Sequence, residues 1–329
     1  MSLEKQAVVE ALHLKKYFDT KKGRILAVDD VSFQIDAGKT LGVVGESGCG
    51  KTTLGRTVIR LAEPTEGKIF FQGQDIFTYN KREMRVLRTK MNIIFQDPYS
   101  SLDPRMTVTN SIAEPMILNK MYSSKAGLDK RVKELMSIVG LSSRVETSYP
   151  HELDGGRRQR VGIARTLAVN PEFIVCDEPV SALDVSIQAQ ILNLLMDLQE
   201  NIGLTYMFIT HDLSVVRHIS QDILVMYRGK TVEMANCDEL FRNPLHPYTK
   251  ALLASIPAPS LSSIGKEPVL IKGEVSSPIN LKPGCRFASR CEYAIGQCGR
   301  EDPELKEPMP GRWTACFLYE NISKEDSYA

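Results

Sequence analysis

The chain lacks any apolar run long enough to span a bilayer, which would take roughly 18 residues. Its first ten residues, MSLEKQAVVE, also lack the charged-then-apolar layout of a secretory signal peptide. From these two absences we expect a cytosolic protein rather than a membrane-spanning or exported one.

An excess of charge of one sign is missing as well. The 41 Lys and Arg residues nearly cancel the 40 Asp and Glu residues, so the broad basic field of a nucleic-acid-binding protein is absent and no nucleic-acid partner is expected. Seven cysteines in 329 residues are too few for a disulfide scaffold. What the chain does have is 43% hydrophobic residues, enough for a large core.

The order of predicted elements indicates an α/β fold. Short β-like runs with turn signals fill the first 80 residues, and residues 106–148 are polar and helix-prone. Two runs, FIVCD (173–177) and YMFIT (206–210), flank a helical stretch around QAQILNLLMDLQ. Strand, helix, strand at this spacing predicts a parallel sheet. After residue 243 the connections become Pro-rich, so we place a domain boundary near 240–260.

A phosphate-binding loop is the most specific motif. Residues 41–53, LGVVGESGCGKTT, match G-x-x-x-x-G-K-[ST] after an apolar strand. Backbone N–H groups of such a loop surround phosphate oxygens, the lysine reaches the β- and γ-oxygens, and the Thr hydroxyl ligates Mg²⁺. The residues expected to bind nucleotide here are Gly45, Glu46, Ser47, Gly48, Cys49, Gly50, Lys51, Thr52 and Thr53.

Acidic residues at the end of another strand should complete this site. Asp177 ends the apolar run in FIVCDEP, where it could hold Mg²⁺ through water, and Glu178 follows, where it could polarise an attacking water. His211 comes just after the YMFIT strand, at the same edge of the predicted sheet.

Taken in order, these motifs resemble those of the ATPase subunit of an ABC transporter: GESGCGKTT, Gln96 in NIIFQDP, the L-x-G-G stretch followed by RQR, FIVCDEP, SALD and THD. Longer stretches outside these motifs are similar to the oligopeptide/dipeptide importer branch. They are LGRTVIRLAEPTEG, DPYSSLDPRMTV, HPYTKALLASIP and the Cys-containing tail. The chain resembles most the second of the two ATPase subunits of such importers, and the resemblance covers residues 5 to about 317.

The resemblance implies a P-loop NTPase core with an N-terminal antiparallel β subdomain and a helical subdomain at about 97–168, together residues 1–245. Residues 246–329 would form a small Cys-containing C-terminal extension. By position, Phe18 is similar to the aromatic residue that stacks on adenine, and its neighbour Tyr17 could take that place instead.

The resemblance also implies the roles of the polar residues. Gln96 would sense Mg²⁺ and nucleotide and signal to the membrane subunits, so that Thr52, Gln96 and Asp177 together hold Mg²⁺. Glu178 would be the general base, and His211 would contact the γ-phosphate and position the attacking water. Asp184, which closes SALD, would touch the opposite ATPase subunit.

The signature stretch departs from the family pattern. Two such subunits face head to tail, and each offers L-S-G-G-Q to the γ-phosphate on the other. Here the stretch is Leu153-Asp154-Gly155-Gly156-Arg157. Asp154 could simply cap the helix as well as Ser does, or it could repel phosphate by about 4 kcal/mol at roughly 4 Å in an effective dielectric near 20. Arg157 could neutralise Asp154 or bind the phosphate itself.

These alternatives lead to a hypothesis of asymmetry. The chain's own loop and acidic residues are intact, whereas the site that uses LDGGR would bind ATP and turn it over slowly. The arrangement requires a heterodimer with a second ABC ATPase subunit.

Four cysteines in the tail, Cys285, Cys291, Cys298 and Cys316, are separated by five, six and 17 residues. These gaps are wider than those of zinc knuckles, while four thiolates are the ligand set of an iron–sulfur cluster. Tails resembling this one carry such a site, so we expect a [4Fe–4S] cluster, with Zn²⁺ or free thiols as the alternatives.

The resemblance thus implies a peripheral ATPase on the cytoplasmic face of the membrane that drives import of oligopeptides or dipeptides. Its partners would be two permease subunits and, indirectly, an extracytoplasmic substrate-binding protein. Related importers carry nickel or oligosaccharides. A soluble ABC ATPase acting on ribosomes or DNA is the alternative class, but such proteins usually carry two cassettes or a long coiled coil. A metal-binding sensor on an ATPase fold is a third, which the intact Glu178 and His211 disfavour.

Overall fold

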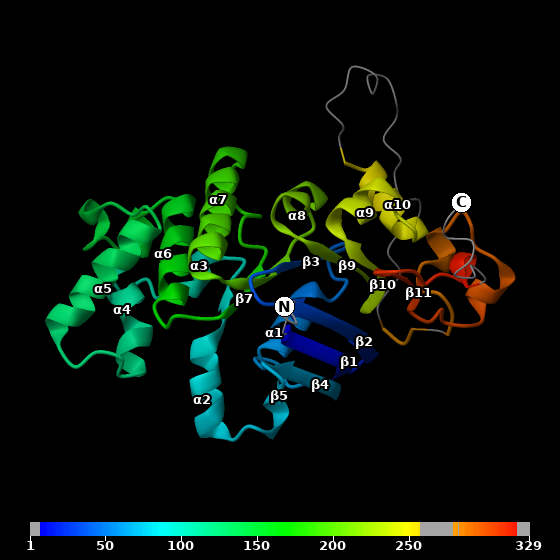
Figure 1. The fold of residues 1–329 in the computed structure, drawn as a ribbon, viewed down its shortest axis with the longest axis horizontal. Coiled ribbons are helices and arrows are strands. Elements are labelled where there is room, and N and C mark those ends of the chain that lie inside the picture. Colours follow the sequence, from blue (N-terminus) through cyan, green and yellow to red (C-terminus); the bar gives the residue numbers. More distant parts are fainter. Residues whose placement is uncertain (1–6, 257–278, 282, 321–329) are drawn as a thin grey trace, which may run out of the picture. The chain divides into compact units, whose positions relative to one another are not determined.

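The computed structural model describes residues 7–256, 279–281 and 283–320 (Figure 1). The chain divides into two compact units, and each is assembled from several segments. Unit 1 consists of Met1–Val8, Ile35–Lys39 and Asp75–Ile209, and unit 2 consists of Val9–Gln34, Thr40–Gln74 and Thr210–Ala329.

The strands of unit 1 are β6 (Met91–Ile94), β7 (Phe173–Asp177) and β8 (Thr205–Ile209). β7 pairs in parallel with both β6 and β8. Every residue of β7 and β8 is buried, as expected where helices cover both faces of a parallel sheet. The predicted FIVCD strand is therefore confirmed residue for residue, and the YMFIT run begins one residue after β8 does.

Helices of unit 1 follow the hydrophobic periodicity of the sequence. Between β7 and β8 the chain forms α7 (Val185–Ile202), which buries one face at positions 191, 192, 195 and 198. Residues 106–148, predicted to be helical, contain α4 and α5, which begin after the N-caps Thr107 and Ser124. The helices are α2 (Lys81–Lys90), α3 (Pro98–Ser101), α4 (Val108–Leu118), α5 (Lys125–Ile138), α6 (Gly155–Leu167) and α7, with 3-10 turns η1 (Ile76–Thr78), η2 (Ser143–Val145) and η3 (Pro150–Glu152).

An antiparallel sheet opens the chain, in the order β2-β1-β4-β5. β1 runs antiparallel to β4, with Val9 opposite Phe71. Along β2, Val31, Phe33 and Ile35 are buried in alternation, so this face of the sheet lies on the core. The strands are β1 (Ala7–Thr20), β2 (Gly23–Asp36), β4 (Glu66–Phe71) and β5 (Gln74–Asp75). The expected N-terminal antiparallel β subdomain is confirmed.

Unit 2 also contains strands in the order β11-β12-β10-β9-β3. β3 and β9 are parallel, whereas the other pairs are antiparallel. The strands are β3 (Thr40–Val44), β9 (Asp222–Tyr227), β10 (Lys230–Asn236), β11 (Lys306–Met309) and β12 (Arg312–Thr314). The helices are α1 (Lys51–Val58), α8 (Leu213–Ile219), α9 (Cys237–Arg242) and α10 (Pro247–Ala254), with 3-10 turns η5 (Ala288–Arg290), η6 (Gly296–Gly299) and η7 (Phe317–Tyr319).

The C-terminal extension contributes to the core of unit 2. Phe287 is buried, and its ring centroid lies 5.3 Å from that of Tyr227 and 5.4 Å from that of Tyr248. The two tyrosine rings are 4.6 Å apart. The extension also supplies β12, whose Thr314 pairs with Glu233 of β10. Strand pairing and aromatic packing therefore join the extension firmly to β9 and β10.

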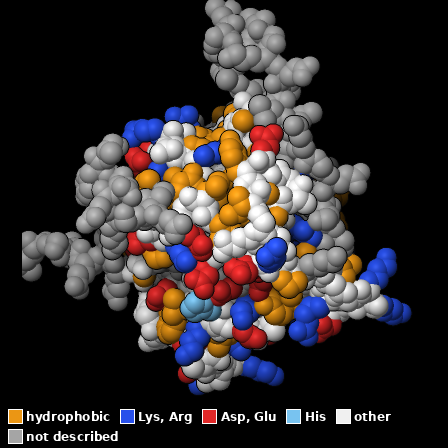
Figure 2. Space-filling model, turned by 90° about the vertical axis from the view of Figure 1, so that its right-hand side faces the viewer, with side chains coloured by type: hydrophobic (Ala, Val, Ile, Leu, Met, Phe, Trp, Pro, Cys, Tyr) orange, Lys and Arg blue, Asp and Glu red, His pale blue; other side chains and the backbone are white. Residues whose placement is uncertain are grey.

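No helix in the described part of the chain is long and apolar enough to cross a membrane. On the face drawn in Figure 2, basic and acidic side chains are interspersed, and hydrophobic side chains gather between them. This face therefore shows no broad field of a single sign.

Candidate functional site

The Gly-rich loop lies in unit 2, between the buried strand β3 and helix α1. Gly50 caps α1 with a φ of 109°, and a Cβ at this position would meet the carbonyl oxygen of Ala27. A Cβ on Gly45 would meet the carbonyl oxygen of Met226. Both positions require glycine, because the backbone of neighbouring strands occupies the space of a side chain.

Lys51, the first residue of α1, is only 5% exposed. Its Nζ donates to the carbonyl oxygens of Gly45 at 2.7 Å and Glu46 at 3.0 Å. The loop thus holds the ammonium group at the positive end of α1, a place suited to an incoming phosphate. The remaining predicted residues of this loop are Ser47, Gly48, Cys49, Thr52 and Thr53. Burial raises the pKa of the Cys49 thiol, which keeps it protonated.

His211 also belongs to unit 2. The N–H of the preceding Thr210 donates to the carbonyl oxygen of Val43 at 3.1 Å, so His211 follows a residue bonded to the strand that leads into the loop. The His211 side chain is exposed. The structure therefore places this histidine near the end of β3.

In unit 1, the predicted sensor and the predicted base are in direct contact. Asp177 ends β7 and is 1% exposed, and Glu178 follows it. The Gln96 side-chain N–H donates to the Glu178 carboxylate at 2.8 Å. Since the amide nitrogen of Gln96 is engaged in this bond, its carbonyl oxygen is the atom left to ligate a cation.

Glu178 has a left-handed backbone, with a φ of 47°, a conformation that non-glycine residues rarely adopt. Its N–H donates to the carbonyl oxygen of Ile209 at 2.9 Å, and this bond to the end of β8 helps to hold the strained geometry. Backbone strain of this kind concentrates at functional sites.

The LDGGR stretch starts helix α6, and Asp154 is its N-cap. The Asp154 carboxylate accepts from the Arg157 backbone N–H at 2.7 Å, and the Arg157 Nε lies 3.5 Å from the same carboxylate. Both side chains are more than half exposed. Asp154 thus caps α6, and Arg157 forms an ion pair with it in this chain.

Two helix N-termini meet at this place in unit 1. A Cβ on Gly156 would lie 2.7 Å from the Ile187 side chain of α7, so the glycine permits close approach of α6 and α7. Asp184 caps α7 and accepts from the Ile187 N–H at 3.0 Å. The hydrogen bond from Ser186 lowers the pKa of Asp184. Gly155 lies against Leu183 and Gly156 against Ile187, residues that flank Asp184 in the chain.

The two candidate aromatic residues differ in their surroundings. Phe18 is 42% exposed, with the Lys16 Nζ 4.8 Å from its ring centroid. Tyr17 is partly buried and donates its hydroxyl to Asp29. Phe18 is therefore the ring more open to a nucleotide base, and Tyr17 is the more strongly anchored.

The structure thus describes the predicted site in two sets. Unit 2 holds the Gly-rich loop, His211 and the two aromatic residues, and unit 1 holds Gln96, Asp177, Glu178, Asp184 and the LDGGR stretch. In unit 1, Gln96 contacts Glu178 and Asp154 contacts Arg157. In unit 2, Lys51 contacts Gly45 and Glu46 of its own loop.

All four tail cysteines line one small cavity in unit 2, together with His246 and Phe287. In the described residues, however, no group of three or more His, Cys, Asp or Glu side chains is arranged to hold a metal ion. The four thiols are free, and burial raises the pKa of Cys285 to about 11.

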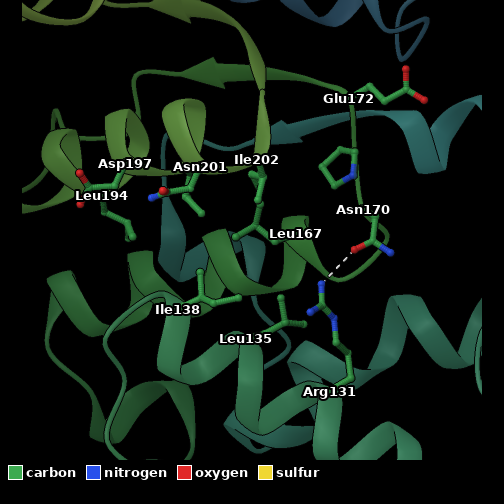
Figure 3. Close-up of a pocket in the computed structure, with 12 residues that line it drawn as sticks. Arg131, Leu135, Ile138, Leu167, Asn170, Glu172, Leu194, Asp197, Asn201 and Ile202 are labelled. Carbon is green, nitrogen blue, oxygen red and sulfur yellow. Dashed lines mark hydrogen bonds between the residues drawn. The ribbon is translucent and has the colours of Figure 1, made fainter. Parts of the chain in front are cut away.

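A second cavity lies in unit 1 between α5, α6 and α7 (Figure 3). Leu135, Leu167 and Ile202 line it, and at its rim the Arg131 guanidinium donates to the Asn170 side chain at 2.9 Å. None of the predicted site residues lines this cavity.

One contact of the loop could not be expected from the sequence. Arg290, from the C-terminal extension, pairs with Glu46 at 2.8 Å. The two are 244 residues apart, and no motif joins them. The one signal in the sequence was that Arg290 lies next to Cys291, in a tail already singled out.

The chain was compared with known proteins. Residues 28–181 match the ABC transporter family model, and residues 232–298 match the model of the oligopeptide/dipeptide transporter C-terminal region. The chain is 50% identical to the oligopeptide transport ATP-binding protein AppF of Bacillus subtilis, over 95% of this chain and 98% of AppF. It is 45% identical to the dipeptide transport ATP-binding protein DppF of Escherichia coli, over 95% of this chain and 94% of DppF.

A solved structure is similar too. The ATP-binding cassette MJ0796, in a dimeric post-hydrolysis state bound to ADP and Pi, superimposes with a TM-score of 0.64 at 30% identity, covering 70% of this chain and 98% of that one. The predicted ABC-type P-loop fold is thereby confirmed. The chain belongs to the family of ABC transporter ATP-binding proteins, in the branch that carries the oligopeptide/dipeptide transporter C-terminal region.

Proposed function

We propose that this chain is the ATP-hydrolysing subunit of an importer of oligopeptides or dipeptides, peripheral on the cytoplasmic face of the membrane. The hydrogen bond from Gln96 to Glu178 carries the proposal, because it joins the residue expected to signal to the permease with the residue expected to activate water. The names of the relatives support peptide cargo.

The catalytic roles follow from the two sets of residues. Lys51 binds the β- and γ-phosphates, and Phe18 stacks on adenine while Tyr17 anchors its strand. Glu178 accepts the proton of the attacking water, and His211 contacts the γ-phosphate. Thr52, Gln96 and Asp177 offer the oxygen ligands that Mg²⁺ prefers, and the bound ion would neutralise charge on the phosphates.

Two permease subunits and a second ABC ATPase subunit are the proposed partners, with an extracytoplasmic substrate-binding protein delivering the cargo. In domain terms, we assign residues 1–245 to the nucleotide-binding domain, with the helical subdomain at about 97–168, and residues 246–329 to the extension. The heterodimer is proposed because a single slow site requires a partner whose signature differs from the LDGGR of this chain.

The altered signature supports one slow site. Asp154 places a carboxylate at the N-terminus of α6, where it accepts from the Arg157 N–H. Its negative charge, only partly offset by Arg157, opposes the γ-phosphate held by the partner. Asp184 would contact the partner subunit beside this signature.

The asymmetry is tested by ATP turnover of the assembled complex with Glu178→Gln in this chain, compared with the matching change in the partner ATPase. Loss of turnover for the change here and a mild effect for the partner's change support a single fast site. Equal damage from the two changes refutes it.

The four cysteines fit a four-thiolate cluster by donor type and number, since all line one cavity. The gaps of five, six and 17 residues between the cysteines are wider than those of zinc knuckles, which favours a cluster over a single Zn²⁺. We therefore propose a [4Fe–4S] cluster as a structural staple. Iron and zinc contents of anaerobically purified protein decide between cluster, Zn²⁺ and free thiols.

Cargo is tested by uptake of labelled di- and oligopeptides into cells with and without Lys51→Ala. Peptide uptake that depends on Lys51 supports the proposal. Uptake of nickel or oligosaccharides alone would reassign the cargo, and association with ribosomes or DNA rather than with membranes would reassign the protein to the soluble ABC ATPases.

A further inference from the structure

Glu46, the second residue of the Gly-rich loop, is held at three of its polar groups. Its carboxylate accepts from both terminal nitrogens of Arg290, at 2.8 and 3.0 Å. Its backbone N–H donates to the Tyr248 hydroxyl at 2.8 Å, and its carbonyl oxygen accepts from Lys51 at 3.0 Å. Two of these three contacts come from the region after residue 245.

The Arg290 side chain is itself buried, being only 6% exposed, while the Glu46 side chain is 23% exposed. Arg290 also donates to the Tyr227 hydroxyl at 3.3 Å. Tyr227 and Tyr248 pack against Phe287. Arg290 is therefore hydrogen-bonded to a residue of a packed aromatic cluster, which restricts its movement. A bidentate Arg–carboxylate pair in such a setting fixes the orientation of the Glu46 side chain and neutralises its charge.

A second arginine of the same short segment reaches the adenine side of the site. Arg286 donates to the carboxylate of Asp29 and to the carbonyl oxygen of Arg228. Asp29 in turn accepts from the Tyr17 hydroxyl, beside Phe18. The segment between Cys285 and Cys291 thus contacts both elements expected to bind ATP in unit 2.

The charge of Glu46 explains why this support matters. A loop that wraps phosphate with backbone N–H groups gains nothing from a carboxylate at its start, since like charges repel. Arg290 neutralises that carboxylate by forming an ion pair with it. The extension therefore supplies the positive charge that balances Glu46 in the loop sequence GESGCGKTT.

We propose that Arg290 is a positioning residue for ATP: by neutralising and fixing Glu46, it makes the affinity of the Gly-rich loop depend on the C-terminal extension. The inference rests on the proposed nucleotide site. It assigns the extension a direct effect on ATP binding, beyond holding the fold together.

The test measures binding of a fluorescent ATP analogue to the full-length chain and the ATP KM and kcat of the assembled complex. Arg290→Met is expected to weaken ATP binding about tenfold, because Glu46 then faces the phosphates uncompensated. Glu46→Gln added to Arg290→Met should restore most of that loss. Glu46→Gln alone should tighten binding by about threefold, since it removes a negative charge from the loop while Arg290 keeps its positive charge. The effect should fall on KM rather than on kcat.

Arg242→Met is the matched control, since Arg242 ends α9 and forms an exposed ion pair with Glu239 of the same helix. Raising the salt concentration should reduce the difference in ATP affinity between Arg290→Met and the double variant, because screening weakens charge repulsion. A merely structural arginine would show neither the rescue by Glu46→Gln nor this salt effect.

The outcomes separate the two proposals. If the unaltered chain fails to bind ATP, or if Lys51→Ala binds it normally, the proposed function fails. If Lys51→Ala abolishes binding while Arg290→Met binds like the unaltered chain, the inference fails. If Arg290→Met does not fold, Arg290→Lys replaces it. The loss of one of the two hydrogen bonds to Glu46 should still weaken ATP binding, and an unchanged affinity for ATP overturns the inference.

Discussion

Replacing Asp154 by Ser or by Ala separates the two effects of this residue. Ser keeps an N-cap acceptor for α6 and removes the negative charge, whereas Ala removes both. Asp154→Ala should therefore cost about 1 kcal/mol of unfolding free energy, the usual effect of a lost cap. Asp154→Ser should cost well under that, and thermal unfolding of the two variants measures the difference.

The effect on turnover can be bounded from the geometry. A carboxylate at roughly 4 Å from a phosphate oxygen is repelled by about 4 kcal/mol in an effective dielectric near 20. Arg157 lies 3.5 Å from the carboxylate, and both side chains are more than half exposed, so pairing and solvent screening remove much of this energy. A remaining repulsion of about 1.4 kcal/mol corresponds to a tenfold change in rate.

The assay uses the assembled complex with Glu178→Gln in this chain, which silences the site on its own loop. The remaining ATP turnover then reports the site that uses LDGGR. Asp154→Ser in that background should raise the remaining turnover about tenfold, while Arg157→Gln alone should lower it. Residual turnover that does not respond to Asp154→Ser would refute the reasoning, and the altered signature would have to be a working one.

Three further variants test other parts of the site and the fold. Gln96→Ala should lower turnover about tenfold or more with a smaller change in ATP affinity, because the Glu178 carboxylate loses its orienting donor; single-turnover kinetics would detect it. Phe18→Ala should weaken ATP binding about tenfold through lost stacking, whereas Tyr17→Phe, which loses only the hydroxyl bond to the neighbouring strand, should weaken it less; equal effects would contradict the stacking role of Phe18. Glu233→Ala should cost about 3–5 kcal/mol of unfolding free energy, because the buried Arg312 loses its carboxylate partner and the backbone N–H groups of Leu245 and His246 lose their acceptor. A urea unfolding curve unchanged from that of the unaltered chain would rule this out.

The elements with strong local signals were predictable from the sequence. The Gly-rich loop is recognised by its local motif, although the backbone atoms that exclude a Cβ at Gly45 and Gly50 belong to the distant residues Met226 and Ala27. FIVCD is a buried strand flanked by breaks in the pattern. The capping role of Asp154 was one of two predicted alternatives, because an N-cap bond spans three residues. What local rules could not decide was whether Arg157 pairs with it, since a long exposed side chain has many rotamers.

Contacts between segments far apart in the chain could not be predicted from the sequence. Nothing in the pattern around Glu46 points to Arg290, because both belong to short irregular segments whose approach is set by the packing of Tyr227, Tyr248 and Phe287. The cysteine spacing likewise left cluster, zinc and free thiols open. The structure shows that the four thiols share one cavity, which depends on turns without any periodic signal.

The join between the extension and β10 bears on how the chain folds as it is made. Synthesis runs from the N-terminus, and β12 pairs with residues made about 80 positions earlier, while Arg290 reaches back 244 positions to Glu46. Contacts of such long range form late and slowly. A growing chain would thus carry its Gly-rich loop through the addition of 244 further residues without the arginine that neutralises Glu46. Full affinity for ATP would arrive only once Arg290 has been made and the extension has docked.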